Sequence, residues 1–279
     1  MALETARTKL LGSLTVRKAY QWLRSVPVVG SALHRIALLA LPMGSRSWVR
    51  IPCGLGEGLS MFVDLRYELG YVRGDHEPWL GDVLRRWLRP GDTFIDVGAH
   101  IGYFSLCAAK LVGPQGVVLA IEPDPENFAR LQANVTRNDL VHIVRPLRAA
   151  VGSAGGEVLF HRASPSSSRV GGHVVRQVEG GGECMRVPLL RLDDWDSGIK
   201  PRTIKVDVEG AEVEVLQGAS RIIGNASSCW IVELHSHNAR EQVLAMLNKA
   251  RYQVRFLQPK HPVYHDYHQE YVLAEPLDL

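Results

Sequence analysis

Acidic residues at the ends of two successive apolar segments point to a pocket for a nucleoside with a charged tail. Phe94 to Val97 is typical of a buried strand, and residues 98–102, Gly-Ala-His-Ile-Gly, form a turn before a helix predicted from Tyr103 to Leu111. The next apolar strand ends in Glu122, whose carboxylate can accept hydrogen bonds from both hydroxyls of a ribose. Asp96 lies one pleat before the turn, where it can face an ammonium group.

Two kinds of cofactor compete for this turn. A dinucleotide requires G-x-G-x-x-G so that the backbone can approach a pyrophosphate, but here His100 stands between Gly98 and Gly102 and the middle glycine is missing. S-adenosylmethionine has no phosphate and needs close backbone approach at fewer points. Asp96 and Glu122 therefore favour S-adenosylmethionine. His100 either covers the ligand or packs against the protein.

A second group of acids, K-V-D-V-E-G-A-E at residues 205–212, follows a later strand. Methyl transfer to a hydroxyl requires alignment of the acceptor and removal of its proton. Asp207 is predicted to end a strand beside the first one and to accept this proton, and Glu209 would point the same way in extended geometry. Gly210 allows a sharp exit, and Glu212 begins a helix. Both glutamates could instead complement the helix dipole.

The residues around Asp207 offer further candidates. Lys205 either neutralises a buried carboxylate or binds substrate. Alternation along the next strand places Glu233, His235 and His237 on one face, where they are predicted to contact the acceptor, with His235 as a possible base. With Asp207 these residues could instead bind a divalent metal, but a metal needs three or four convergent ligands at set distances, which one sequence does not establish, so no metal is assigned.

Five segments carry a family resemblance over about Gly74 to Glu233. They are G-D-H-E-P, G-D-T-F-I-D-V-G-A-H-I-G-Y-F-S, A-I-E-P-D-P-E-N-F-A-R-L-Q-A-N, K-V-D-V-E-G-A-E and W-I-V-E-L-H. Together they resemble the FkbM family of S-adenosylmethionine-dependent methyltransferases, and K-x-D-x-E-G-x-E is the most specific of them. The resemblance implies an α/β fold, a Rossmann-like seven-stranded class I methyltransferase sheet with helices on both faces. It also implies methylation of hydroxyl oxygens on carbohydrates, glycolipids or secondary metabolites, and that Glu77 reaches the cofactor pocket.

Length and composition predict one α/β domain with an N-terminal arm. With 279 residues and 46% apolar content, the chain can bury one sizeable core. Residues 1–46 are predicted to form a basic helical arm and residues 47–279 the methyltransferase domain, which includes a β-hairpin or lid at 47–73 and an antiparallel insertion at 148–190. The four cysteines form no C-x-x-C pair, which fits a reducing compartment and argues against a zinc site.

The first 50 residues are strongly basic. They contain eight Lys or Arg and one acid, while the whole chain has a net charge of only +3. The arm could be an amphipathic helix on anionic lipid, a helical cap whose basic side faces water, or a mitochondrial-type leader. No apolar run approaches the roughly 18 residues that span a bilayer. We therefore predict a cytoplasmic protein, with residues 1–46 as the candidate for peripheral membrane contact.

Three other functions compete with methyl transfer. A non-catalytic nucleoside-binding or scaffolding module recruited by the basic arm would not need the acids Asp207, Glu209 and Glu212 around one glycine. The broken glycine turn disfavours an NAD-linked oxidoreductase. Methylation of nucleic acid is disfavoured because D-V-E-G lacks an N-P-P-Y-like segment that grips a flipped base. The predicted partner is a small-molecule or glycan acceptor, with no nucleic acid; no oligomeric state is predicted.

Overall fold

The computed structural model describes residues 45–65, 68, 70–71, 76–162, 173–175, 183–195, 200–257 and 270–277. Nearly all of the predicted basic arm lies outside these residues. Parts of the predicted hairpin region and insertion lie outside them as well. Within the described residues, no helix combines the length and apolar character needed to cross a membrane.

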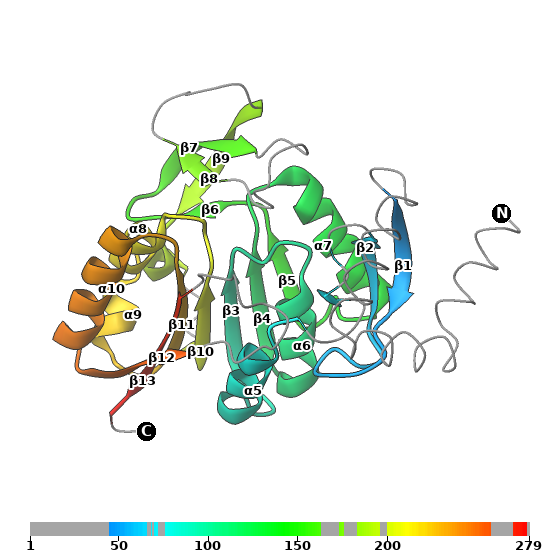
Figure 1. Cartoon of the computed structure of the whole chain (residues 1–279), viewed down its shortest axis with the longest axis horizontal. Coiled ribbons are helices and arrows are strands. Elements are labelled where there is room, and N and C mark those ends of the chain that lie inside the picture. The colour runs from blue at the N-terminus through cyan, green and yellow to red at the C-terminus, as the bar shows by residue number, and fades with distance from the viewer. Residues whose placement is uncertain are drawn as a thin grey trace, which may run out of the picture.

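A seven-stranded sheet forms the centre of the domain (Figure 1). Its strands are β3 (Thr93–Val97), β4 (Val117–Ile121), β5 (Val144–Leu147), β10 (Thr203–Val206), β11 (Cys229–Leu234), β12 (Tyr252–Leu257) and β13 (Glu270–Pro276). Their order is β12-β13-β11-β10-β3-β4-β5. The pairs from β11 to β5 are parallel, whereas β13 runs antiparallel to both of its neighbours. Because β10 lies beside β3, the two acidic segments meet at one edge of the sheet.

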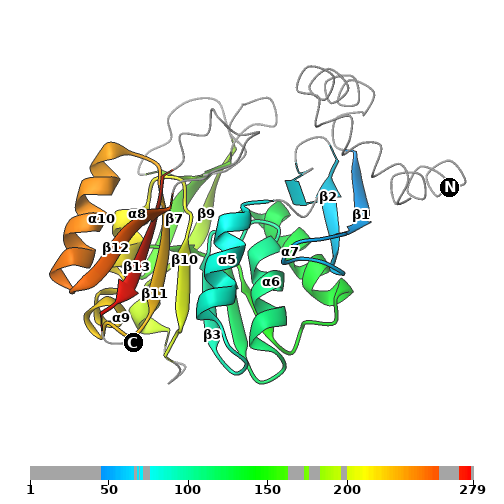
Figure 2. The same cartoon turned by 60° about the horizontal axis from the view of Figure 1, so that its bottom comes forward.

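Helices cover both faces of this sheet (Figure 2). One face carries α5 (Pro78–Trp87), α6 (Tyr103–Val112) and α7 (Pro125–Arg137), and the other carries α8 (Glu212–Gln217), α9 (Ser220–Gly224) and α10 (His237–Lys249). Side chains of β3 alternate between the two cores, so Phe94 packs on the first face and Ile95 on the second. The predicted fold class is confirmed.

Local signals in the sequence fix the start of α7. The side chain of Asp124 accepts hydrogen bonds from the backbone N–H groups of Glu126 (2.8 Å) and Asn127 (2.9 Å), and Pro125 occupies the first helical position. This cap holds the helix directly after the end of β4, next to Glu122.

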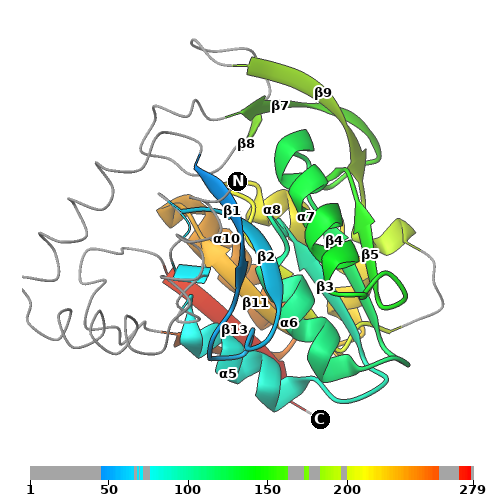
Figure 3. The ribbon, with the colours of Figure 1, turned by 90° about the vertical axis from the view of Figure 1, so that its right-hand side faces the viewer.

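A hairpin packs on the outer side of α7. Strand β1 (Arg46–Arg50) pairs antiparallel with β2 (Ser60–Asp64), as predicted for this stretch, and Figure 3 shows the pair beside α7. The fully buried Asn134 of α7 accepts a hydrogen bond from Phe62 N (2.7 Å) and donates one to Ile101 O (2.8 Å). Asn134 thus joins the hairpin to the turn after β3.

A second, smaller sheet forms the insertion at the top of Figure 1. Its strands are β6 (Ala150–Val151), β7 (Gly156–Arg162), β8 (His173–Val175) and β9 (Glu183–Leu190), in the order β6-β9-β7-β8. Strand β7 is antiparallel to β8 and β9, but β6 is parallel to β9. The insertion is therefore mixed rather than wholly antiparallel. A single turn of 3-10 helix, η1 (Leu192–Asp194), then leads away from β9.

Candidate active site

The glycine turn after β3 is held tightly against the end of β10. Gly98 has a φ of 78°, and a Cβ placed on it would lie 1.7 Å from the carbonyl oxygen of Asp207. Gly102 has a φ of 89°, and its Cβ would meet Leu131 at 2.4 Å. Only glycine fits either position without displacing its neighbour. His100 also lies in the left-handed region, with a φ of 51°. The turn therefore places the predicted cofactor loop in direct contact with Asp207.

Glu122 is positioned immediately after β4 by two backbone hydrogen bonds. One oxygen accepts from His100 N at 2.8 Å and the other from Asp124 N at 2.9 Å. Burial raises the pKa of Glu122 to about 7, although these two bonds oppose the shift. The side chain of Asn127 also donates to Glu122, so three of the four acceptor positions of the carboxylate are used within the protein and one stays open for a ligand.

Asp96 is predicted to face the ammonium group of the cofactor, and in the structure it already lies beside an ammonium group of the protein, that of Lys205. Asp96 Oδ2 accepts a hydrogen bond from Ser105 Oγ at 2.6 Å, and Oδ1 lies 3.5 Å from Lys205 Nζ. Lys205 Nζ also lies 3.1 Å from Asp207 Oδ2 and donates to Gly98 O at 3.4 Å. Burial alone would lower the pKa of Lys205, but Asp207 and Asp96 raise it overall. Lys205, with 4% of its side chain exposed, thus neutralises the buried carboxylate of Asp96 and the partly exposed one of Asp207.

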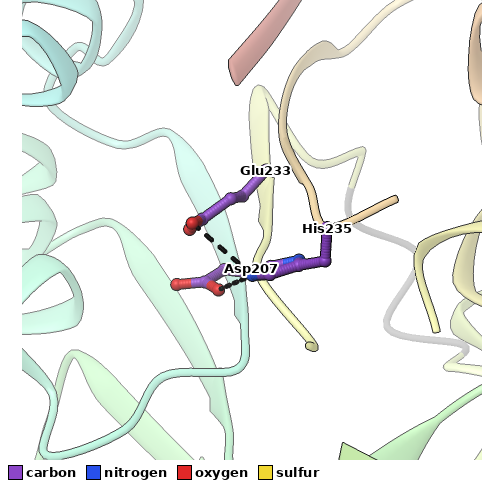
Figure 4. Close-up of side chains that lie close together, drawn as sticks. All are labelled: Asp207, Glu233 and His235. Carbon is purple, nitrogen blue, oxygen red and sulfur yellow. Dashed lines mark ion pairs between the residues drawn. The ribbon is translucent and has the colours of Figure 1, made fainter. Parts of the chain in front are cut away.

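His235 lies at the centre of an acidic cluster (Figure 4). Its Nδ1 is 2.7 Å from Glu212 Oε1. Its Nε2 is 3.5 Å from Glu233 Oε1, 3.6 Å from Glu209 Oε2 and 3.9 Å from Asp207 Oδ1. The structure therefore brings together the predicted catalytic residues, and it adds Glu212 as the group that orients the imidazole ring.

Glu209 reaches this cluster by a different route from the one predicted. Strand β10 ends at Val206, and Glu209 has a φ of 52°, so the extended geometry predicted for Glu209 is wrong. Gly210, with a φ of 109°, completes the sharp exit, and Glu212 is the first residue of α8, as predicted. The fully buried Glu212 side chain folds back to accept a hydrogen bond from Gly210 N at 2.8 Å.

The predicted placement of His237 on the face of the strand is wrong. Strand β11 ends at Leu234, and Ser236 caps α10 by accepting a hydrogen bond from Ala239 N at 3.1 Å. His237 is therefore the first residue of a helix, where strand alternation no longer applies. Its side chain is 78% exposed and lies 3.7 Å from Glu241.

Tyr271 of β13 is a residue of this site that the sequence analysis missed. Its hydroxyl lies 2.8 Å from Glu77 Oε1 and 2.7 Å from Glu233 Oε2. A phenol donates only one hydrogen, so one of these carboxyl groups must carry a proton when both contacts are made. The sequence does contain a signal for this contact, since Tyr271 lies in an apolar strand. A tyrosine buried in such a strand usually needs a polar partner for its hydroxyl.

The pKa values of the acids around Tyr271 are spread widely. Burial raises the pKa of Glu233 to about 10, with the negative charges of Asp207 and Glu77 adding to the effect. Burial, together with Asp207, also raises the pKa of Glu77 to about 7. Burial acts in the same direction on Asp207, but Lys205 and His235 outweigh it and hold the pKa of Asp207 below its usual value. Asp207 is therefore ionised beside a protonated Glu233.

His235 is also shifted toward its charged form. Burial would lower its pKa, but the hydrogen bond that it donates to Glu212 and the negative charges of Asp207 and Glu209 raise it overall. The imidazole is held in one orientation by Glu212, with Nε2 toward the other acids.

The strand order, the glycine turn and the acids at the strand ends define an S-adenosylmethionine-dependent methyltransferase. Residues 96–257 match the methyltransferase FkbM domain, which is more than half of the chain. The chain belongs to the FkbM methyltransferase family.

Relatives of this chain are known in several organisms. The hexuronic acid methyltransferase AglP of Haloferax volcanii is 32% identical over 174 residues, which cover 61% of this chain and 68% of AglP. The 31-O-demethyl-FK506 methyltransferase FkbM of Streptomyces tacrolimicus is 53% identical over 51 residues, which cover 18% of this chain and 19% of that enzyme. A crystal structure of methyltransferase FkbM from Methylobacillus flagellatus KT aligns with a TM-score of 0.49 and 18% identity, over 69% of this chain and 50% of that one.

Proposed function

We propose that this protein transfers the methyl group of S-adenosylmethionine to a hydroxyl oxygen of a carbohydrate-like or secondary-metabolite acceptor. The observation that carries the proposal is the contact between Gly98 and Asp207, because it sets the cofactor turn against the acid-bearing end of β10. A methyl group held over the turn would therefore face Asp207 and the cluster around His235.

The cofactor half of the site is assigned to the ends of β3 and β4. Glu122 would accept a hydrogen bond from a ribose hydroxyl, and Gly98 and Gly102 would allow close approach of the adenosyl group and the amino-acid tail. His100 and Glu77 would border this pocket. Asp96 would act indirectly through Lys205, since its side chain is only 1% exposed, Ser105 donates to its Oδ2 and Lys205 Nζ lies 3.5 Å from its Oδ1.

The acceptor half is assigned to the ends of β10 and β11. The acceptor oxygen attacks the methyl carbon, the carbon–sulfur bond breaks, and the sulfonium becomes a neutral thioether. The hydroxyl proton leaves to a group among Asp207, Glu209 and His235. Glu212 would position His235, while Lys205 and Glu233 would set the electrostatic environment of Asp207. His237 is left out of this assignment because its side chain points into solvent.

The names of two relatives support an oxygen acceptor on such a molecule. One name gives the 31-O position of demethylated FK506, and the other gives a hexuronic acid, which carries both hydroxyl and carboxyl groups. The cluster of four acids around His235 further favours a neutral or cationic group at the reacting position over an anionic one.

The proposal is tested by transfer of tritium from methyl-labelled S-adenosylmethionine into fractionated polar extracts and a panel of sugars and glycolipids. We expect label in a product whose new methyl group is an ether, shown by its resistance to mild base, which cleaves methyl esters. Label found only on carboxyl groups or nitrogen atoms would refute hydroxyl methylation. Saturable cofactor binding without transfer to any fraction would instead favour the non-catalytic binding module.

A further inference from the structure

Three side chains at the ends of β10 and β11 converge on one point (Figure 4). Asp207, Glu233 and His235 each offer one ligand atom, and these atoms all lie within 4.8 Å of one another. His235 Nε2 is 3.9 Å from Asp207 Oδ1 and 3.5 Å from Glu233 Oε1. Ligands that bind one small cation at about 2.0–2.3 Å stand about 3–4 Å apart, so only small movements are needed to coordinate one.

Each of these three side chains is anchored through its other polar atom. The anchoring distances are 3.1 Å from Lys205 Nζ to Asp207 Oδ2, 2.7 Å from Tyr271 Oη to Glu233 Oε2 and 2.7 Å from Glu212 Oε1 to His235 Nδ1. Metal ligands are typically oriented in this way, with a carboxylate or other neighbour fixing the far side of the ring or carboxyl group. The arrangement leaves Asp207 Oδ1, Glu233 Oε1 and His235 Nε2 directed toward each other.

A buried oxygen within this group has no hydrogen-bond partner among the described residues. Glu233 is only 2% exposed, and its Oε1 makes no hydrogen bond there; the same holds for His235 Nε2. Buried polar atoms in folded proteins are normally paired, and leaving one unpaired costs free energy. An oxygen and a nitrogen aimed at the same point are both satisfied if a cation lies between them.

The acids around His235 also favour a bound cation at this point. Glu209 and Glu212 also contact His235, so four carboxyl groups gather around one imidazole. Lys205 contributes one positive charge, and it lies on the far side of Asp207, at Oδ2. A positive ion at the point of convergence would be attracted by these carboxyl groups and would displace the proton that Glu233 carries in its absence.

We propose that Asp207, Glu233 and His235 bind one divalent cation that holds the acceptor hydroxyl, an inference that rests on the function proposed above. Two carboxylates suit Mg²⁺ and Mn²⁺, while an imidazole suits the transition metals, so Mn²⁺ satisfies both ligand types. Three protein ligands leave coordination positions for the acceptor oxygen.

With a bound cation, the group that accepts the hydroxyl proton can be assigned more narrowly. Bound to the cation, the hydroxyl oxygen gives up its proton more readily and then attacks the methyl carbon as the carbon–sulfur bond breaks. His235 Nε2, being a ligand, does not take the proton. Glu209 does, since its Oε2 lies 3.6 Å from His235 Nε2 and its side chain is 43% exposed, which allows the proton to pass on to solvent.

The test uses the full chain after removal of metals with EDTA and gel filtration. Mn²⁺ binding is measured by titration calorimetry and by the loss of the electron paramagnetic resonance signal of free Mn²⁺. We expect one site per chain. Glu233→Gln should weaken binding more than about 100-fold, and Tyr271→Phe, which removes an anchoring contact, about 10–100-fold. Glu241→Gln removes a similar charge at an exposed position of α10 and should leave binding unchanged.

The outcomes separate this inference from the function it rests on. The cation site is overturned if the metal-free protein shows no saturable Mn²⁺ binding, or if folded Glu233→Gln binds Mn²⁺ as tightly as the parent. Full methyl transfer in excess EDTA would also overturn it while leaving the proposed function intact. Conversely, one Mn²⁺ per chain that Glu233→Gln abolishes would support the site even if no acceptor were methylated. Circular dichroism checks that each variant is folded.

Discussion

The two halves of the site are built from different kinds of contact. Around β3 and β4, backbone geometry sets the pocket: glycines with positive φ and N–H groups that fix Glu122. Around β10 and β11, polar and charged side chains from β10, β11, β13, α8 and the residue before α5 hold one another in place, with His235 and Tyr271 as the connecting residues. The first half thus depends on short stretches of chain, whereas the second depends on contacts between distant segments.

The largest expected effect is at the junction of the two halves. Gly98→Ala places a methyl group against Asp207 O, so it should destabilise the fold by about 1–2 kcal/mol for the left-handed conformation and about 1–3 kcal/mol more for overpacking. The matched control is Gly91→Ala, which has a φ of 88° and open space around its Cβ. In urea denaturation, Gly91→Ala should lose only the stability that the left-handed conformation costs, without the further loss from overpacking. Equal losses of stability in both variants would mean that the contact with Asp207 is unimportant.

Next in size is the effect of removing the charge that orients His235. Glu212→Gln should lower methyl-transfer turnover by about 10–100-fold, because the imidazole loses the partner of its Nδ1. Cofactor affinity should change little, since Glu212 lies on the acceptor side. The control is Glu214→Gln on the same helix. Turnover equal to that of the parent would show that the ring needs no such partner.

A pH dependence is expected in the cofactor half. Since the pKa of Glu122 is raised to about 7 and a ribose hydroxyl donates to the carboxylate, cofactor affinity should increase as pH rises through this value. The dissociation constant measured by calorimetry should fall several-fold from about pH 6 to pH 8. Glu122→Gln should bind more weakly at high pH and lose most of this dependence. If the parent and Glu122→Gln had the same pH profile, Glu122 would not be the group that binds the ribose.

The smallest expected effect is at His237. Because its side chain lies in solvent at the start of α10, His237→Ala should change turnover less than about twofold and leave stability within about 0.5 kcal/mol. Steady-state methyl transfer and thermal melting measure both quantities. A large loss of turnover would instead support a role for His237 at the acceptor site, as predicted from strand alternation.

The sequence predicted best what depends on neighbouring residues. The unit from β3 through its turn to α6 and the start of α8 at Glu212 both follow from local patterns, and the structure has each of them. His237 failed because the capping serine Ser236 ended the strand geometry one residue earlier.

Contacts between distant segments could not be predicted in the same way. Tyr271 meets Glu77 across 194 positions of the chain, and His235 meets Glu212 across 23. Neither pair has a spacing that any helix or strand period would mark. Lys205 had two interpretations until its position between Asp96 and Asp207 was known.

The most direct test of the division between the two halves is a paired measurement on Asp207→Asn. Cofactor affinity is measured by calorimetry and methyl transfer by label on the same preparation. We predict a dissociation constant within about threefold of the parent and a turnover reduced at least about 100-fold, because the asparagine keeps the shape of Asp207 but not its charge. Normal turnover, or a loss of cofactor affinity as large as the loss of turnover, would contradict the account.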